Sequence, residues 1–199
     1  MLGATHLAVG VGAALALIQP TTLGACFTAT IGGAVGGVLA DVDAMKNDGK
    51  LGSTQVQGFA TILTVSILIL DSVLKTGVWA EIAKRSQEVL TAGCILFGVL
   101  WIVGYFSNHR SFTHSLGGMC LFTWAVSLFC PSMSMSFLAG YGSHLVLDLL
   151  NRRPLKLFYP LERGFCFHVF YSNREANTLC FYAGCLLSAY YIIRLWLPL

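Results

Sequence analysis

Apolar segments alternate with short polar connections along almost the whole chain. The apolar segments cover residues 7–18, 23–40, 59–74, 89–106, 116–130, 135–150 and 179–197. Most of them approach the roughly 20 residues with which a helix crosses the hydrocarbon core of a bilayer. The first is shorter and ends at Gln19-Pro20, so it either crosses as a short helix or does not fully cross. The pattern predicts an all-α bundle of about six to seven apolar helices.

Composition places this bundle in a membrane. Of the 199 residues, 56% are hydrophobic and only 11% are charged, and the mean hydropathy is +0.72. Soluble domains carry about 25% charged residues, so a soluble fold would lack the polar groups to cover its surface. We therefore predict a polytopic integral membrane protein whose main partner is the lipid bilayer. The net charge of +3 is too small to indicate nucleic-acid binding.

The alternation of segments also predicts where polar side chains lie. The chain contains no internal repeat or linker, so residues 1–199 are expected to form a single domain. If every apolar segment crosses the membrane, one side receives His6, Asp41, Asp43, His114, His144 and Asp148, whereas Asp71 falls on the other side. Most of the twelve Lys and Arg residues lie in connections on the His/Asp side, which the positive-inside rule assigns to the cytoplasm. Convergence of His and Asp at one depth of an apolar chain is typical of a metal site.

The clearest motif is GYGSHLVLD, which covers residues 140–148. His144 and Asp148 are four residues apart, so they project from one helical face, about one turn from each other. This spacing allows both side chains to bind one ion, or one to bind the ion while the other orients it. The alternative is a helix-capping pair at the membrane surface.

A second motif is NHRSFTHS, residues 108–115, between two apolar segments. His114 immediately precedes an apolar segment and can therefore project into the bundle. Arg110 offers a planar set of donors that suits a phosphate or a carboxylate. The alternative interpretation of this motif is a plain polar turn.

Two further candidates are weaker by themselves. Asp41-Val42-Asp43 ends a glycine-rich apolar segment, and such carboxylate pairs are common at divalent-metal sites because the cation relieves their repulsion. Asp is also an ordinary loop residue, however. His6 is a lone histidine near the terminus, which is more often incidental than a ligand.

Together, these motifs resemble the YdjM-type family of membrane-bound metal-dependent hydrolases. The shared elements, in the order of that family, are His6-x3-Gly10, Asp41-x-Asp43, HRxxTHS at 109–115 and GYxSHxxxD at 140–148. The resemblance implies a metal-dependent hydrolase that is remotely similar to zinc-dependent phospholipase C. One position departs from the family pattern Pro-Asp-x-Asp-His, because Ala44 stands where the final histidine is expected. One ligand or proton-transfer group of the family is therefore missing.

The sequence leads to one main hypothesis, hydrolysis of a phosphoester, including a lipid-linked one, by metal-activated water. The expected metal ligands are His6, Asp41, Asp43, His114, His144 and Asp148. Asp43 or His109 is expected to act as a further ligand or general base, and Arg110 to hold a substrate anion. Zinc fits imidazole and carboxylate ligands best, with manganese as the second choice. The site is expected to face the cytoplasm from the inner membrane.

Two other classes of protein fit the same side chains. A transporter would use the His/Asp cluster to bind a transported metal ion or proton, with polar residues continuing to the other side. A non-catalytic scaffold would close the coordination of a structural metal with four protein ligands, whereas an enzyme would leave an open position beside Arg110.

Overall fold

A computed structural model describes residues 2–47, 52–169 and 174–197 of the chain. The helices in these ranges are α1 (Gly3–Ile18), α2 (Leu23–Leu39), α3 (Ser53–Leu74), α4 (Val78–Ala83), α5 (Gln87–Phe106), α6 (Leu116–Phe129), α7 (Pro131–Leu150) and α8 (Arg174–Trp196), with two 3-10 helices, η1 (Ala40–Asn47) and η2 (Phe112–His114). The described residues contain no β-strand, only an isolated bridge between Leu155 and Phe165. The predicted all-α class is confirmed.

Each predicted apolar segment corresponds to one helix and extends at most one residue beyond its end, and several helices begin earlier than their apolar segments. α1 starts at Gly3, so His6 lies inside a helix and not before one. The predicted loop 41–57 also contains η1 and the start of α3. The reason is that apolar residues mark only the part of a helix that faces lipid or core, while its polar ends continue outside that part.

Three helices at the edge of the bundle expose apolar side chains that a bilayer would cover. Ile62 of α3 is 66% exposed, Ile102 of α5 is 54% exposed, and Leu186 of α8 is 71% exposed. Within the described ranges, four helical stretches are long and apolar enough to span a membrane: Leu23–Met45, Ser53–Leu74, Gln87–Phe106 and Glu175–Trp196. The helices α1 and α6 are apolar but shorter. The fold is therefore an integral membrane helical bundle, as predicted.

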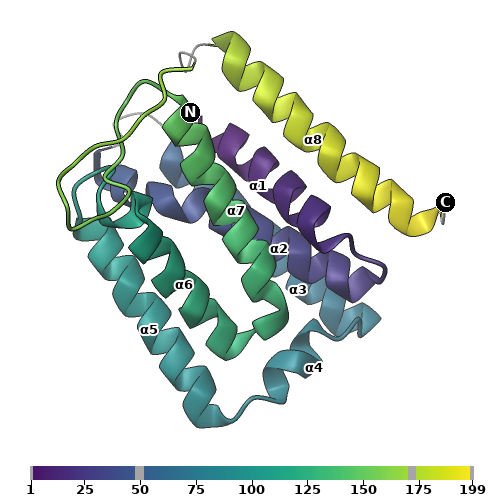
Figure 1. Ribbon diagram of the computed structural model, residues 1–199. Coiled ribbons are helices and arrows are strands. Elements are labelled where there is room, and N and C mark those ends of the chain that lie inside the picture. Colours follow the sequence, from purple (N-terminus) through teal and green to yellow (C-terminus); the bar gives the residue numbers. More distant parts are fainter. Residues whose placement is uncertain (1, 48–51, 170–173, 198–199) are drawn as a thin grey trace.

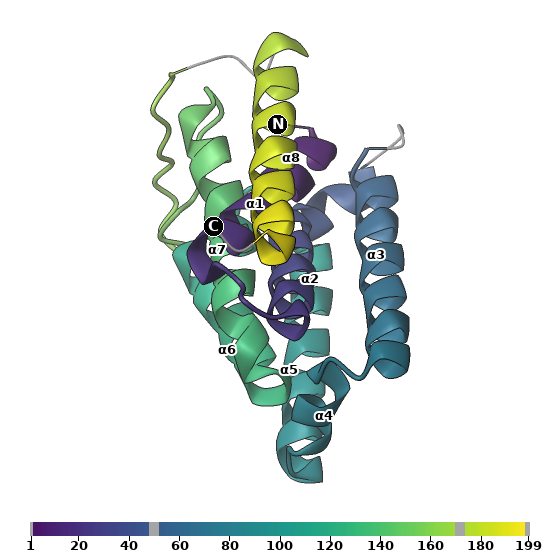
Figure 2. The ribbon, with the colours of Figure 1, turned by 90° about the vertical axis from the view of Figure 1, so that its right-hand side faces the viewer.

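The centre of the bundle is built from α1, α2 and α7, and α8 covers the outer side of α1 (Figures 1 and 2). Glycine lets the backbones of the three central helices touch. A Cβ atom on Gly140 of α7 would lie 2.5 Å from the carbonyl oxygen of Gly33 in α2, and one on Gly10 of α1 would lie 2.6 Å from the same oxygen. This close approach brings His6 of α1 against His144 of α7, and their rings stack with centroids 3.8 Å apart.

Replacement of Gly140 by Ala should destabilise the protein because the new methyl group has no room against the α2 backbone. We expect a loss of roughly 1–3 kcal/mol, as for other overpacked cores. Gly98 of α5 provides the control, since a Cβ there meets nothing within 4 Å. Gly98→Ala should be neutral or stabilising by up to about 1 kcal/mol. Thermal unfolding in detergent compares the two variants, and equal melting temperatures would contradict the packing described.

The end of the bundle near α4 is held by polar contacts of its own. The Asp71 carboxylate accepts hydrogen bonds from the backbone N–H groups of Val78 and Trp79, at 3.1 and 2.8 Å. In the same region, a carboxylate oxygen of Glu81 accepts from the backbone N–H of Ser132 at 2.9 Å. Asp71, in the last turn of α3, therefore caps the start of α4 and lies at the end of α3 away from the His/Asp side, as the alternation of segments predicted.

Candidate metal centre

All the predicted His and Asp side chains lie at one end of the bundle. His6 comes from the start of α1, Asp41 and Asp43 from η1, and His114 from η2, while His144 and Asp148 come from the last two turns of α7. Five of these side chains are almost fully buried, each with at most 2% exposure: His6, Asp43, His114, His144 and Asp148. The up-and-down path of the helices explains the convergence, because every second connection returns to the same end.

Three donor atoms form a nearly equilateral triangle in the middle of the cluster. Nε2 of His114 lies 3.4 Å from Nε2 of His144. Oδ1 of Asp41 lies 3.5 Å from the first nitrogen and 3.7 Å from the second. In a tetrahedral zinc site with bonds of about 2.0–2.1 Å, neighbouring donor atoms are separated by roughly 3.3–3.4 Å. The triangle therefore fits three corners of such a site.

Hydrogen bonds on the far side of each imidazole turn these nitrogens toward each other. Nδ1 of His144 lies 2.8 Å from the carbonyl oxygen of Gly37, which can only accept, so this nitrogen carries the proton. Nδ1 of His114 lies 3.2 Å from Oδ2 of Asp43 and donates to that carboxylate. Metal-binding histidines in proteins are held in this way, by a carbonyl or a carboxylate on the other ring nitrogen. Both Nε2 atoms are thus presented as ligands.

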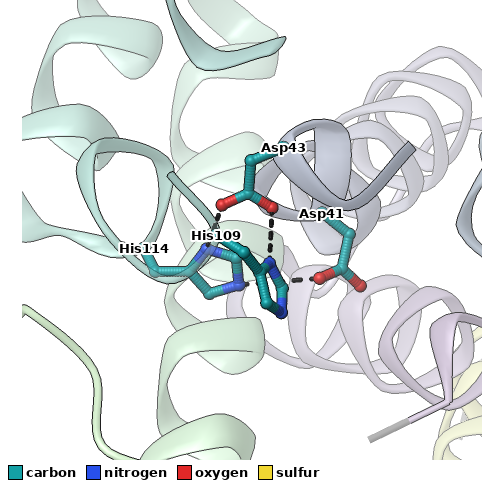
Figure 3. A group of neighbouring side chains, drawn as sticks. All are labelled: Asp41, Asp43, His109 and His114. Carbon is teal, nitrogen blue, oxygen red and sulfur yellow. Dashed lines mark hydrogen bonds and ion pairs between the residues drawn. The ribbon is translucent and has the colours of Figure 1, made fainter. Parts of the chain in front are cut away.

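Asp43 is the carboxylate that organises this end of the bundle (Figure 3). One oxygen lies 2.8 Å from Nδ1 of His109, and the other accepts from the backbone N–H of Arg110 at 3.0 Å and from the Thr113 hydroxyl at 2.9 Å. Its 3-10 helix has about three residues per turn, so the side chains at positions 41 and 43 diverge. Asp43 consequently faces Nδ1 of the His114 ring, and Asp41 faces Nε2.

Replacement of Asp43 by Asn should weaken metal binding without removing a donor of the triangle. The amide has the shape of the carboxylate but lacks its charge and one acceptor, so it holds His114 poorly. The expected loss of metal affinity is roughly 10- to 100-fold, the range typical of residues that orient a ligand. Asp71→Asn removes a buried carboxylate at the other end and should leave the affinity unchanged. Isothermal titration with zinc compares the variants, and an unaltered affinity in Asp43→Asn would contradict the orienting role.

Asp148 joins the triangle to two further side chains. Its Oδ1 atom lies 3.4 Å from Nε2 of His6, and its Oδ2 atom lies 3.2 Å from an amino group of Arg110 and 3.8 Å from Nε2 of His114. Nδ1 of His6 is buried and has no hydrogen-bond partner among the described residues. The position of His6 therefore depends on its contacts with Asp148 and the His144 ring.

The donor set fits a divalent ion on chemical grounds. The donor atoms form two groups, and within each group they lie within 4.8 Å of one another. The first group is Asp41, Asp43, His109 and His114, and the second is His6, His144 and Asp148. Buried imidazole nitrogens that face each other and two carboxylates are stabilised when a cation lies between them. The structure therefore contains His/Asp groups that could hold a metal ion.

The His114 ring binds a second proton in the absence of a metal ion, because two carboxylates contact it. Burial lowers the pKa of His114, but hydrogen bonds to Asp41 and Asp43 outweigh burial and raise it to about 9. His114 is therefore protonated at neutral pH in the metal-free protein. Metal binding has to displace that proton, so the affinity for metal should fall as the pH decreases.

Two members of the cluster, His109 and Asp41, reach the protein surface. The His109 side chain is 37% exposed and Asp41 is 16% exposed, whereas Asp43 and His114 are fully buried. Arg110 is 14% exposed and has a left-handed backbone conformation, with φ of 64°. A ligand from outside would therefore meet His109, Asp41 and Arg110 before the buried histidines.

Several supporting residues were not predicted from the sequence. The Tyr141 hydroxyl donates to the carbonyl oxygen of Thr113 and so fixes η2 against α7. Ser115 accepts from the backbone N–H of Gly118 and caps α6. Asn177 of α8 accepts from the backbone N–H of Leu2 through its side-chain oxygen, 2.8 Å away, and so holds the start of α1. Tyr141 and Ser115 lie within the two recognised motifs, which was the available signal, whereas nothing in the sequence singled out Asn177.

Comparison with known proteins identifies the family. The family model described as YdjM inner membrane protein matches residues 1–197, so the chain belongs to this family. The match confirms membership of the YdjM family, to which the motifs pointed. No curated protein and no solved structure matches the chain.

Proposed function

We propose that the chain, as a member of the YdjM inner membrane protein family, is a metal-dependent hydrolase that cleaves a phosphoester. The observation that carries the proposal is the triangle formed by Nε2 of His114, Nε2 of His144 and Oδ1 of Asp41. A catalytic metal site keeps one position free for water or substrate, and the partly exposed Asp41 and Arg110 lie on the side from which a substrate would approach. Zinc is the first choice and manganese the second, because the donors are imidazole and carboxylate.

The proposed ligands are His114, His144, Asp41 and Asp148, and His6 would be held through Asp148. A further position beside Arg110 would be left for water or substrate, and this open position would distinguish the site from a closed structural one. When bound, the ion supplies Lewis acidity that polarises a phosphoryl oxygen and makes water more acidic. We assign Asp43 to orientation of His114 and His109, because its oxygens already accept from several donors. The sequence analysis counted Asp43 among the metal ligands, and we now propose that it orients a ligand instead.

His109 is the proposed general base. Its Nδ1 atom is held by Asp43 at 2.8 Å, which leaves Nε2 to take a proton from the attacking water while the P–O bond to the leaving group breaks. The ring is partly exposed, so substrate can reach it.

Arg110 is proposed to hold the substrate phosphate. Its guanidinium lies against Asp148, 3.2 Å from Oδ2, and therefore beside the proposed ligands. Its other amino group donates to the carbonyl oxygen of Arg153 at 2.8 Å, which keeps the side chain extended across the site. Planar guanidinium groups bind phosphate oxygens with two parallel hydrogen bonds, so this position suits an anionic substrate.

A vesicle experiment tests the activity, its orientation and the rival functions together. Inside-out and right-side-out membrane vesicles that contain the zinc-loaded protein receive membrane-impermeant phosphoesters, and released phosphate is measured. Hydrolysis only in inside-out vesicles would support an enzyme whose site faces the cytoplasm. Transport of zinc or protons across the membrane without any hydrolysis would contradict the proposal in favour of a transporter. Bound metal with neither hydrolysis nor transport would contradict it in favour of a structural metal.

A further inference from the structure

The segment that follows α7 carries an unusual surface for a connection between helices. Residues 152–169, named here the interface segment, expose five large apolar side chains: Phe158 by 50%, Tyr159 by 44%, Leu161 by 66%, Phe167 by 69% and Val169 by 62%. The segment also contains four Lys and Arg residues and one Glu, which gives a net charge of +3 by subtraction. Aromatic and aliphatic side chains interleaved with arginine are typical of surfaces that lie in the headgroup layer of a membrane.

Backbone hydrogen bonds hold the interface segment in a defined conformation. Leu155 and Phe165 exchange two of them, at 2.9 and 2.8 Å, and the Leu155 side chain is fully buried beneath the segment. The N–H groups of Phe167 and Val169 donate to carbonyl oxygens at the end of α7, at 2.8 and 3.0 Å. The exposed apolar side chains are thus presented by an ordered scaffold.

The position of the segment places it at the level of the membrane interface. The backbone N–H of Leu116, the first residue of α6, donates to the carbonyl oxygen of Leu157 at 2.9 Å. Beside this contact the end of α5 exposes Phe106 by 73%, and Leu116 itself is 37% exposed. The interface segment therefore borders the apolar outer surface of α5 and α6 at the end that carries the His/Asp cluster (Figure 1).

The segment is also bonded directly to Arg110. The Arg110 side chain donates to the carbonyl oxygen of Arg153 at 2.8 Å, and the backbone N–H of Lys156 donates to the carbonyl oxygen of Arg110 at 3.2 Å. The same guanidinium contacts Asp148. An anionic group bound at the surface of the segment therefore lies next to the residue that faces the proposed metal ligands.

We propose that the interface segment binds the anionic headgroup layer of the bilayer and presents a lipid-linked phosphoester to Arg110. The binding rests on the exposed side chains and their charge. Delivery of a lipid substrate rests in addition on the proposed hydrolase function. Arg153 and Arg163 attract the phosphates, while Phe158 and Leu161 enter the acyl boundary. The substrate class that follows is a phospholipid-like phosphoester that reaches the site from the plane of the membrane.

The first test measures lipid binding and does not depend on hydrolysis. Native mass spectrometry of the protein in detergent compares binding of phosphatidylglycerol, which is anionic, with phosphatidylcholine, which is zwitterionic. Arg153→Gln/Arg163→Gln should weaken phosphatidylglycerol binding roughly tenfold to thirtyfold, because each arginine near an anionic surface contributes about one factor of five. The matched control, Lys75→Gln/Lys84→Gln, removes two charges near the opposite end and should bind as the wild type does. Equal binding of both lipids by the wild type, or equal losses in the two variants, would overturn the proposal.

The second test asks whether the segment delivers substrate. Phe158→Ser/Leu161→Ser should lower hydrolysis of phosphatidylglycerol in vesicles by about tenfold or more, because the apolar anchor is lost. Hydrolysis of water-soluble glycerophosphoglycerol and the metal content should stay unchanged. Leu74→Ser, which changes an exposed leucine at the other end of α3, should affect neither substrate. Equal losses on both substrates would overturn the delivery role. If the wild type hydrolyses no phosphoester at all, the proposed function is wrong, and the binding test alone decides whether the segment is a lipid-binding surface.

Discussion

His144→Ala and Asp148→Ala should each lose nearly all bound metal and all metal-dependent hydrolysis. Removal of His144 takes away one corner of the donor triangle, and removal of Asp148 takes away a proposed ligand that also contacts His6. The loss of metal affinity should exceed the roughly 10- to 100-fold effect that is typical when a residue only orients a ligand. Elemental analysis after zinc loading and dialysis measures the effect, with hydrolysis assayed on the same samples.

Two controls separate loss of metal from loss of the fold. His168 lies on the exposed interface segment and not in the cluster, so His168→Ala should retain metal at the wild-type level. His144→Gln and Asp148→Asn keep most of the buried volume, and they should still lose metal although they unfold close to the wild-type temperature. Wild-type metal content in His144→Gln would remove this residue from the set of ligands.

Arg110→Ala should leave the metal in place and still abolish most of the activity. The positively charged guanidinium cannot bind a metal ion, and it competes with the ion for Oδ2 of Asp148. Its removal should therefore keep metal affinity the same or increase it. Transition-state stabilisation should fall by roughly 2–4 kcal/mol if Arg110 acts as a preorganised donor to the phosphate.

Arg110→Lys is the matched variant, because it keeps the positive charge but loses the planar set of donors. Its activity should lie between those of the wild type and of Arg110→Ala. The measurement is kcat/KM on one phosphoester, with zinc content determined in parallel. Full hydrolysis by Arg110→Ala would show that Arg110 does not bind the substrate anion.

The convergence of the site could be predicted from the sequence because it follows from topology. Short connections between long apolar helices force neighbouring helices to run in opposite directions, so His6, His114 and Asp148 return to one end. Spacing within α7 was equally informative, since residues four apart share a helical face. These predictions need only the length and order of the segments.

The separate roles of Asp41 and Asp43 could not be predicted in the same way. The motif suggested two carboxylates that share one cation, because nothing in the sequence indicated the 3-10 helix at this position. In that helix the two side chains diverge, and they contact opposite nitrogens of His114. The carbonyl oxygen that orients His144 belongs to Gly37, and a backbone acceptor leaves no signature in residue types. Sequence patterns therefore located the cluster, while helix geometry determines which members face an ion.

The metal content of the wild-type protein tests the central claim most directly. Protein purified without chelator is loaded with zinc, dialysed extensively, and compared by elemental analysis with His114→Ala/His144→Ala treated identically. The wild type should retain at least one zinc ion per chain. The reason is that three donor atoms are already separated by distances close to those between neighbouring ligands of a tetrahedral zinc ion. The double variant should retain only a trace. Equal trace amounts in both proteins, after loading with zinc and separately with manganese, would show that the cluster is not a metal centre.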